Sequence, residues 1–215
     1  MTKENDWYYI PHHPVLKPCR VTHKMRIVFD ASAKSVNYSL NSLNDLLECG
    51  PNLMPNIASV FLNFRCKPIG FVADFKKAFL QTGMHDKDRR VLRFLWFKDR
   101  PDSFTVPNFQ CYQFCHVPFG IAPGPFFLNG GIIAHLNYFK QLGNQYSELI
   151  GNIENNFYVD DLISGADNIV KAHKIAYEMT EIFAYASFEL RKWRFSYETD
   201  IENPVVPVLG TKWKL

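Results

Sequence analysis

Tyr158-Val159-Asp160-Asp161 is the stretch of this 215-residue sequence on which its interpretation depends. Two adjacent carboxylates stand between apolar neighbours, as at a hairpin tip, where Asp tolerates a positive φ. Two like charges at one tip repel each other. A hard divalent cation such as Mg²⁺, which prefers carboxylate oxygens, would remove that repulsion. The stretch therefore predicts a metal site at a hairpin.

A third carboxylate is expected from Asp74. It closes an apolar run at residues 69–73, which is typical of a buried strand of about five residues. We expect Asp74, Asp160 and Asp161 to lie close enough together to share magnesium ions.

The composition is that of a protein with a substantial core. Hydrophobic residues make up 47%, charged residues 21% and aromatic residues 15%, and the net charge is +3. The aromatic content suits a sheet-rich core and also surfaces that stack nucleotides, and the core is the simpler explanation. A charge of +3 indicates nucleic acid only weakly.

Neither a signal peptide nor a membrane span is predicted. The first six residues are polar, and no apolar run reaches the roughly 18 residues that a span needs. The five cysteines are odd in number and irregular in spacing, so reduced thiols of an intracellular protein are expected. They are Cys19, Cys49, Cys66, Cys111 and Cys115.

Periodicity predicts a chain that contains both strands and helices. Extended segments or strands are expected at 7–20, 24–34, 69–73, 91–97, 109–117, 154–159, 188–195 and 208–213. Apolar and polar residues alternate at 109–117, as in a half-buried strand. Helices are expected in two pieces over 40–64, at 125–142, and at 168–185 with Asp167 as N-cap. Apolar residues at helical spacing, among them Leu40, Leu46, Ile57 and Ile169, are expected to form their core-facing stripes. Gly130-Gly131 lies inside the helix expected at 125–142, where each Gly costs about 1 kcal/mol of helix stability against Ala. Close packing against another group and mere tolerance of the two glycines are both open explanations.

Some polar clusters have two interpretations. Lys24, Arg26 and Lys34 flank a strand, either as a phosphate clamp or as a solvated strand end. His12-His13 and the Cys111, Cys115, His116 group fit packing or surface positions better than metal ligation, since no second pair has zinc spacing.

Six motifs in order resemble the fingers and palm of a reverse transcriptase, and their wording is most similar to the BEL/Pao group of LTR retrotransposons. They are KMRIVFDASAK at 24–34, VADFKKAFLQ at 72–81, PFG at 118–120, FYVDDL at 157–162, FELRKW at 188–193 and LG at 209–210. The resemblance covers roughly residues 8–213, nearly the whole chain.

The resemblance implies an α+β fold, a right-hand polymerase palm whose antiparallel sheet is backed by helices, with a fingers subdomain and the thumb largely absent. Residues 1–215 would form one fingers/palm domain. The fingers would comprise 1–68 and 82–118, and the palm 69–81 and 119–215.

It also implies RNA-directed DNA polymerase activity, which adds dNTPs to a primer 3′-hydroxyl. Asp74, Asp160 and Asp161 would be the catalytic residues and, with the backbone carbonyl of Phe75, the metal ligands. Two Mg²⁺ ions about 3.5–4 Å apart are expected, with Mn²⁺ as a substitute.

The nucleotide-binding residues follow from the same resemblance. Arg26, with Lys24 beside it, would grip the triphosphate, and Phe79 would be the aromatic gate that excludes a 2′-hydroxyl. The other expected contacts are Phe119 and Gly120 with the incoming nucleotide, Lys192 near the pyrophosphate, and Tyr158, Leu209 and Gly210 with primer or template.

Three features depart from the family pattern. Cys19 stands where many relatives have a lysine for the γ-phosphate, so that Arg20 or Lys24 would have to substitute. The loop reads Ala122-Pro123-Gly124-Pro125, without the usual Ser before the second proline. Gly130-Gly131 is unusual in the helix that follows.

The expected partners are an RNA or DNA template with annealed primer, dNTPs, and the protease, RNase H and integrase of a Pol polyprotein of which the chain is a piece. The expected location is the cytoplasm, in a retrotransposon virus-like particle, without membrane association. The alternatives are an inactive or domesticated binding module, a viral RNA-dependent RNA polymerase, whose hairpin normally carries Gly-Asp-Asp, and a structural protein with fortuitous acidic turns.

Overall fold

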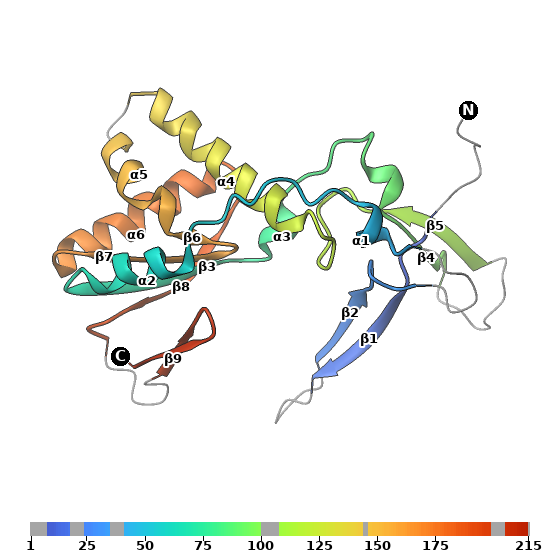
Figure 1. Ribbon diagram of the computed structural model, residues 1–215, viewed down its shortest axis with the longest axis horizontal. Coiled ribbons are helices and arrows are strands. Elements are labelled where there is room, and N and C mark those ends of the chain that lie inside the picture. Colours follow the sequence, from blue (N-terminus) through green and yellow to red (C-terminus); the bar gives the residue numbers. More distant parts are fainter. Residues whose placement is uncertain are drawn as a thin grey trace. The chain divides into compact units, whose positions relative to one another are not determined.

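Strand β3 (Ile69–Phe75) lies inside a four-stranded antiparallel sheet, ordered β6-β7-β3-β8, in the computed structural model (Figure 1). Its neighbours are β7 (Asp161–Ala166) and β8 (Leu190–Phe195), and β7 also pairs with the short β6 (Phe157–Tyr158). The structure describes residues 8–17, 24–34, 41–99, 108–143, 146–198 and 205–214. Apolar side chains on both sides of β3 are buried, as expected for a central strand.

One face of this sheet is covered by α6 (Ile169–Ala184). The Phe75 ring packs edge-on against Phe183 of this helix, with 4.7 Å between centroids. Helix α4 (Gly124–Gln141) joins α6 through His135, whose Nε2 lies 2.7 Å from the carbonyl oxygen of Ile182. Helix α5 (Ser147–Ile153) and the 3₁₀ turn η3 (Glu154–Asn156) lead into β6.

The opposite face is covered by α2 (Ile57–Arg65) and by the hairpin of β9 (Val205–Val208) and β10 (Thr211–Lys214). These elements bury one apolar cluster with the sheet, namely Val60, Phe64, Val72, Ile163 and Val208. Because side chains alternate along a strand, Asp74 shares the face of Val72, and Asp161 shares the face of Ile163.

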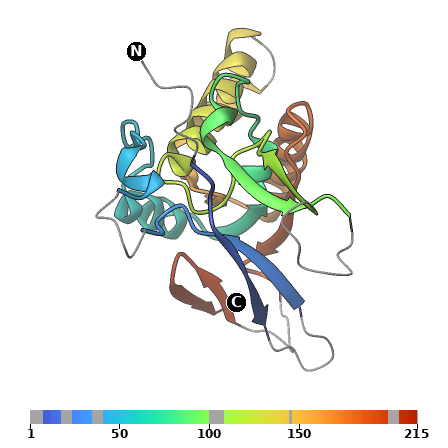
Figure 2. The ribbon, with the colours of Figure 1, turned by 90° about the vertical axis from the view of Figure 1, so that its right-hand side faces the viewer.

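A second compact unit consists of residues 1–51 and 79–127. Two antiparallel ribbons form it, β1 (His12–Lys17) with β2 (Lys24–Phe29), and β4 (Arg93–Phe97) with β5 (Phe109–Gln113) (Figure 2). The Phe29 ring lies 5.0 Å from that of Phe94 and joins the two ribbons. Short helical turns complete it: α1 (Leu43–Leu46), α3 (Ala78–Gln81), whose first residue belongs to the sheet unit, and η1 (Arg89–Val91).

The sheet unit comprises residues 52–78 and 128–215. The two compact units therefore divide the chain at other residues than the expected fingers and palm, since α2 belongs with the sheet and residues 119–127 with the ribbons. The fingers and palm assignment itself remains a prediction.

The α+β class with antiparallel sheets and helices is confirmed, and so are the helices expected at 125–142 and 168–185. Residues 154–156, expected in a strand, form a 3₁₀ turn, in which Asn156 donates to the Ser164 hydroxyl at 3.0 Å. Helix α5 was not expected at all, and residues 208–213 form a hairpin instead of one strand.

Several local predictions were wrong. The N-cap of α6 is Asn168, whose side chain accepts from Lys171 N at 2.9 Å, because Asp167 pairs with two lysines instead. Three side chains expected in helical core stripes are exposed, namely Leu46, Ile57 and Ile169, which lie on a one-turn helix or at a helix start. Strand β5 belongs to a two-stranded ribbon, so it is mostly exposed and not half-buried.

No helix in the described part of the chain is both long and apolar enough to cross a membrane. Four cysteines are free thiols at exposed positions, Cys49, Cys66, Cys111 and Cys115. Cys19, Arg20 and Leu40 lie outside the described residues.

Candidate active site

The register of β3 with β7 sets Asp74 directly opposite Asp161. Directly opposed residues of an antiparallel pair have Cα atoms about 4.5–5.5 Å apart and side chains on one face. Phe75 N donates to the carbonyl oxygen of Asp160 at 2.9 Å, so the strand that carries Asp74 is also fastened to the turn before Asp161. Regular sheet pairing thus brings acidic residues 86 or more positions apart into one place.

Asp160 lies in the two-residue turn between β6 and β7, whose Tyr158 pairs with Asp161. The positive φ of this turn, 56°, falls on Val159 and not on an aspartate, which corrects the expectation from the sequence. A β-branched residue at positive φ is strained. The hairpin therefore presents its carboxylates at a cost in backbone energy.

The three carboxyl groups interact electrostatically. The pKa of Asp161 is raised to about 6, first because the side chain is desolvated by burial, and then by the negative charges of Asp160 and Asp74, while Lys192 acts in the opposite direction. Crowded acids that resist ionisation are typical of sites that bind cations or protons.

Two cations of β8 reach Asp74. Lys192 Nζ lies 2.5 Å from Asp74 Oδ2, and Arg191 Nε lies 3.3 Å from Asp74 Oδ1. The second contact is close enough for an ion pair but is not aligned as a hydrogen bond. Asp74 Oδ1 and Arg191 Nε, both buried, have no hydrogen-bond partner among the described residues.

A cavity of about 340 Å³ opens beside these groups, lined by Asp74, Asp161, Lys192 and residues of β9. Carboxylate oxygens on neighbouring strands, one of them buried without a hydrogen bond, fit the ligands that Mg²⁺ prefers. Within the described residues, no group of three or more His, Cys, Asp or Glu is arranged to hold a metal ion. The donor chemistry fits a divalent cation, while the Asp74 carboxylate is engaged by Lys192.

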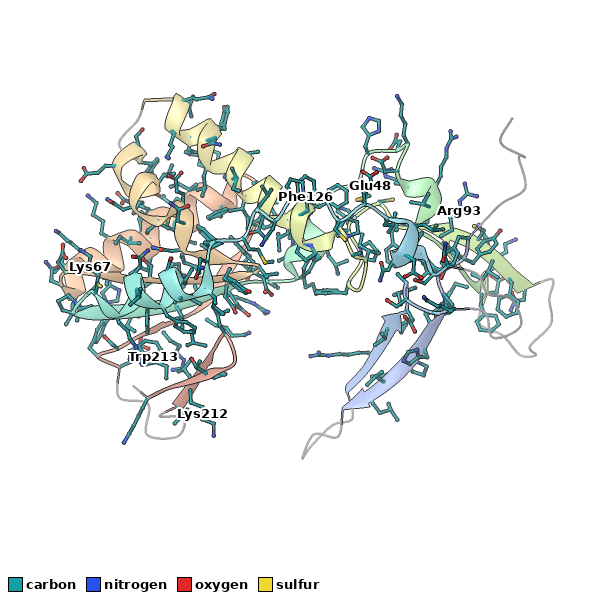
Figure 3. All side chains as sticks on the ribbon, viewed as in Figure 1. Glu48, Lys67, Arg93, Phe126, Lys212 and Trp213 are labelled. Atoms are coloured by element: carbon teal, nitrogen blue, oxygen red, sulfur yellow. The ribbon has the colours of Figure 1, made fainter. Side chains whose placement is uncertain are left out.

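A larger cavity lies elsewhere. It measures about 740 Å³ and is lined by residues of α2 and of the β9–β10 hairpin, and Lys67, Lys212 and Trp213 are among its lining residues (Figure 3). No residue of the predicted site lines it. Size alone therefore does not locate the chemistry, and the smaller cavity is the better candidate because two of the three predicted carboxylates, those of Asp74 and Asp161, line it.

In the ribbon unit, Phe79 and Phe119 lie together, with 4.9 Å between ring centroids. A Cβ on Gly124 would come within 3.3 Å of the Phe79 ring, and one on Gly120, whose φ is +91°, within 3.1 Å of the Phe29 carbonyl oxygen. The predicted gate residue is thus half-buried against the 118–124 loop, and the Phe119 side chain is 55% exposed.

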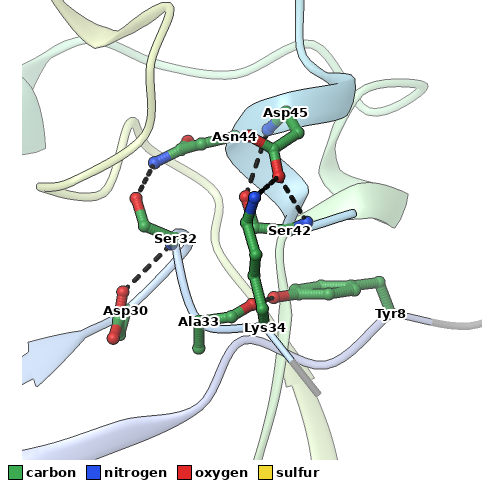
Figure 4. Close-up of polar contacts among 8 residues, drawn as sticks. All are labelled: Tyr8, Asp30, Ser32, Ala33, Lys34, Ser42, Asn44 and Asp45. Carbon is green, nitrogen blue, oxygen red and sulfur yellow. Dashed lines mark hydrogen bonds and ion pairs between the residues drawn. The ribbon is translucent and has the colours of Figure 1, made fainter. Parts of the chain in front are cut away.

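Of the basic side chains around Arg26, Arg26 is exposed to solvent, whereas Lys34 is held in an ion pair. Arg26 is exposed on β2, opposite Val15. Lys34 instead pairs with Asp45 at 2.8 Å, and this ammonium is the first cause that lowers the Asp45 pKa to about 2 (Figure 4). Lys34 therefore favours a structural role, and the side chain of Lys24 is not described.

Asn44 has a role in the structure that the sequence did not indicate. Its Nδ2 donates to Ser32 Oγ (Figure 4) and to the Gly120 carbonyl, and its Oδ1 accepts from Ala122 N, each at 2.8 Å. The single amide fastens the Phe119 loop to the segment after β2. A lone Asn in a leucine-rich stretch gave no signal of this role.

Leu209 and Gly210 form the two-residue turn of the β9–β10 hairpin, with φ of 44° and 79°. Two successive positive φ values are typical of a type I′ turn, in which Gly is favoured. Of the predicted residues, the sheet unit thus contains Asp74, Phe75, Tyr158, Asp160, Asp161, Lys192, Leu209 and Gly210, and the ribbon unit contains Lys24, Arg26, Phe79, Phe119 and Gly120.

Solved structures of foamy virus protease-reverse transcriptase are similar to this chain. A complex with an RNA/DNA hybrid has a TM-score of 0.64 at 16% identity, covering 95% of this chain and 22% of that one. A prototype foamy virus mutant structure has a TM-score of 0.66 at 15% identity, covering 96% and 23%. A complex with double-stranded DNA has a TM-score of 0.64 at 16% identity, covering 95% and 29%.

The fold is that of these reverse transcriptases. This chain spans less than a third of the length of each of them. No family model and no curated protein matches the sequence.

Proposed function

We propose that the chain is the reverse transcriptase domain of a BEL/Pao-type retrotransposon polyprotein, an RNA-directed DNA polymerase that adds dNTPs to a primer 3′-hydroxyl. The observation that carries the proposal is the pairing of Asp74 with Asp161, beside the turn that holds Asp160, in a chain with this fold.

In this proposal Asp74, Asp160, Asp161 and the carbonyl of Phe75 hold two Mg²⁺ ions, or Mn²⁺ in their place. Bound there, the ions would lower the pKa of the primer hydroxyl and neutralise the triphosphate. The chain's own task is positioning and charge stabilisation. The raised pKa of Asp161 supports a site that gains from a cation.

The remaining roles are assigned to exposed or half-buried groups. Arg26, with Lys24, binds the triphosphate, and Phe79 with Phe119 and Gly120 shapes the space at the sugar. Lys192 lies beside Asp74, near the place proposed for pyrophosphate. Tyr158, Leu209 and Gly210 contact primer or template.

Two of the similar foamy virus structures are complexes, one with an RNA/DNA hybrid and one with double-stranded DNA, which supports a nucleic-acid partner for this fold. We propose a primer–template and dNTPs as the partners here. The protease, RNase H and integrase of the polyprotein, and a location in cytoplasmic virus-like particles, belong to the same proposal.

Primer extension on poly(rA)/oligo(dT) with Mg²⁺ tests this function. Asp160→Asn should lower the extension rate by about 10³-fold or more, because removal of a metal-binding carboxylate forfeits several kcal/mol of charge stabilisation. Asp167→Asn is the matched control, since Asp167 is an exposed acid paired with two lysines. An Asp160→Asn protein that is folded and as active as the control would refute the assignment.

The gate is tested separately. Phe79→Val should raise ribonucleotide incorporation relative to dNTP incorporation roughly 10- to 100-fold, the range that a lost steric contact in a pocket provides. Leu80→Val, at the exposed neighbouring position of α3, should leave the ratio unchanged. An unchanged ratio in Phe79→Val would remove Phe79 from this role.

A further inference from the structure

Strand β8 contains an irregularity at the site. Its pairing with β3 runs Val72↔Arg194 and then Asp74↔Arg191, so that Lys192 and Trp193 stand opposite Ala73 alone. Such a β-bulge re-aims a side chain, and its first residue can adopt the left-handed region that suits Gly. Here that residue is Lys192, with φ of 54°.

The bulge places the Lys192 ammonium on the carboxylate opposite Asp161, 2.5 Å from Asp74 Oδ2. We infer that Lys192 is a resident cation of this site, which occupies Asp74 and which a divalent metal ion must displace to bind. The inference rests on the proposed function, in which Asp74 is a metal ligand.

The exposure of the two partners makes displacement feasible. The Asp74 side chain is 21% exposed and is fixed in the central strand, whereas the Lys192 side chain is 65% exposed. A lysine has a long flexible stem, so its ammonium can leave without a change in the sheet. Exposed ion pairs are weak, and a desolvated carboxylate gains more from a divalent ion.

The neighbouring cation, Arg191, does not occupy Asp74 in the way that Lys192 does. Arg191 Nε lies 3.3 Å from Asp74 Oδ1 and forms no aligned hydrogen bond there. Its residue is directly paired with Asp74 in the register, so it is part of the regular ladder. Lys192 is therefore the cation whose position depends on the bulge.

Removal of the resident cation should tighten metal binding. Lys192→Gln should bind Mn²⁺ roughly 2- to 5-fold more tightly than the wild type, the factor expected from loss of one competing exposed ion pair. Without metal, Lys192→Gln should unfold at a lower temperature than the wild type. The crowded carboxylates lose the ammonium group that the β-bulge places beside Asp74.

Calorimetric titration of the full chain with Mn²⁺, with thermal unfolding as a second readout, tests this. Lys76→Gln is the matched control: it removes the same charge beside β3, but Lys76 pairs with Glu189 at 2.6 Å and not with Asp74. Asp160→Asn reports whether the heat comes from the proposed site. Lys192→Gly, which suits the positive φ, repeats the test if Lys192→Gln does not fold.

Tighter Mn²⁺ binding in Lys192→Gln than in Lys76→Gln supports the inference, and so does binding that appears only once Lys192 is replaced. Equal or weaker binding in Lys192→Gln, with wild-type binding that Asp160→Asn removes, overturns the inference and leaves the proposed function standing. No Mn²⁺ binding by either wild type or Lys192→Gln overturns both.

Discussion

The two strands that pair with β3 place opposite charges beside Asp74: β7 places a carboxylate there, and β8 places two cations. On the β7 side the pairing is regular and sets Asp74 against Asp161, like charge against like charge. On the β8 side the pairing is broken by a bulge and supplies Arg191 and Lys192. Regular backbone pairing fixes the repulsive contact between Asp74 and Asp161, whereas the attractive contact between Asp74 and Lys192 depends on an exposed side chain. The sheet pairing thus keeps the two acids together, and the exposed cation is the one that we infer a metal ion displaces.

The largest stability effect is expected on the β7 side. The pKa of Asp161 in the folded chain is about 6, against 3.8 ordinarily, so folding favours the protonated form. Wild-type stability should fall as pH rises from 4 to 6, while Asp161→Asn should not show this loss. The full shift corresponds to about 3 kcal/mol, which we reduce to about 1–2 kcal/mol for a half-exposed side chain.

Chemical denaturation of both proteins at pH 4 and pH 7 measures this. Asp161→Asn should be the more stable at pH 7 and nearly equal at pH 4, and saturating Mg²⁺ should narrow the difference by stabilising the wild type. A constant difference at the two pH values would mean that the carboxylates are not crowded.

A smaller effect is expected at the turn of that side. Val159→Gly should stabilise the chain by about 0.5–1 kcal/mol, because the relieved positive φ outweighs the greater entropy that Gly loses on folding. The opposite change at the other hairpin, Gly210→Ala, should destabilise it. Equilibrium unfolding measures both, and a destabilised Val159→Gly would show that the valine contacts matter more than the strain.

The smallest effect is expected on the β8 side. Lys76→Gln removes an ion pair whose side chains are 43% and 54% exposed, so the loss should be about 0.5 kcal/mol or less. Unfolding at low and at high salt would measure it. A loss well above 1 kcal/mol would show that cations on this side stabilise the sheet and are not readily exchanged.

Much of the scaffold could be predicted from periodicity. In helices α4 and α6 and in the central strand, the apolar pattern extends over enough residues to identify the type of element. Helix α5 is short, with a Gly inside it, and its two buried residues, Ile150 and Ile153, are too few to form a pattern. Gly131 meets nothing within 4 Å of an added Cβ, and Gly130 only an ordinary contact, so the structure favours tolerance over close packing at this pair.

In the candidate site, too, some features could be predicted from the sequence and others could not. The acidic pair at the hairpin tip was visible because adjacent carboxylates between apolar residues are unusual. The bulge at Lys192 was not, since a basic strand such as LRKWRF gives no sign of where its register shifts. Asn44 was missed for a similar reason, because its three hydrogen bonds reach segments 12 to 78 residues away.

The central claim is that Asp74, Asp160 and Asp161 together bind divalent metal. Anomalous diffraction from crystals of the chain soaked in Mn²⁺ tests it most directly. We predict a peak beside the Asp74 carboxylate, between it and the Asp160-Asp161 turn, with the Lys192 ammonium moved away. A fully occupied peak elsewhere, with the Lys192–Asp74 ion pair intact, would contradict the claim.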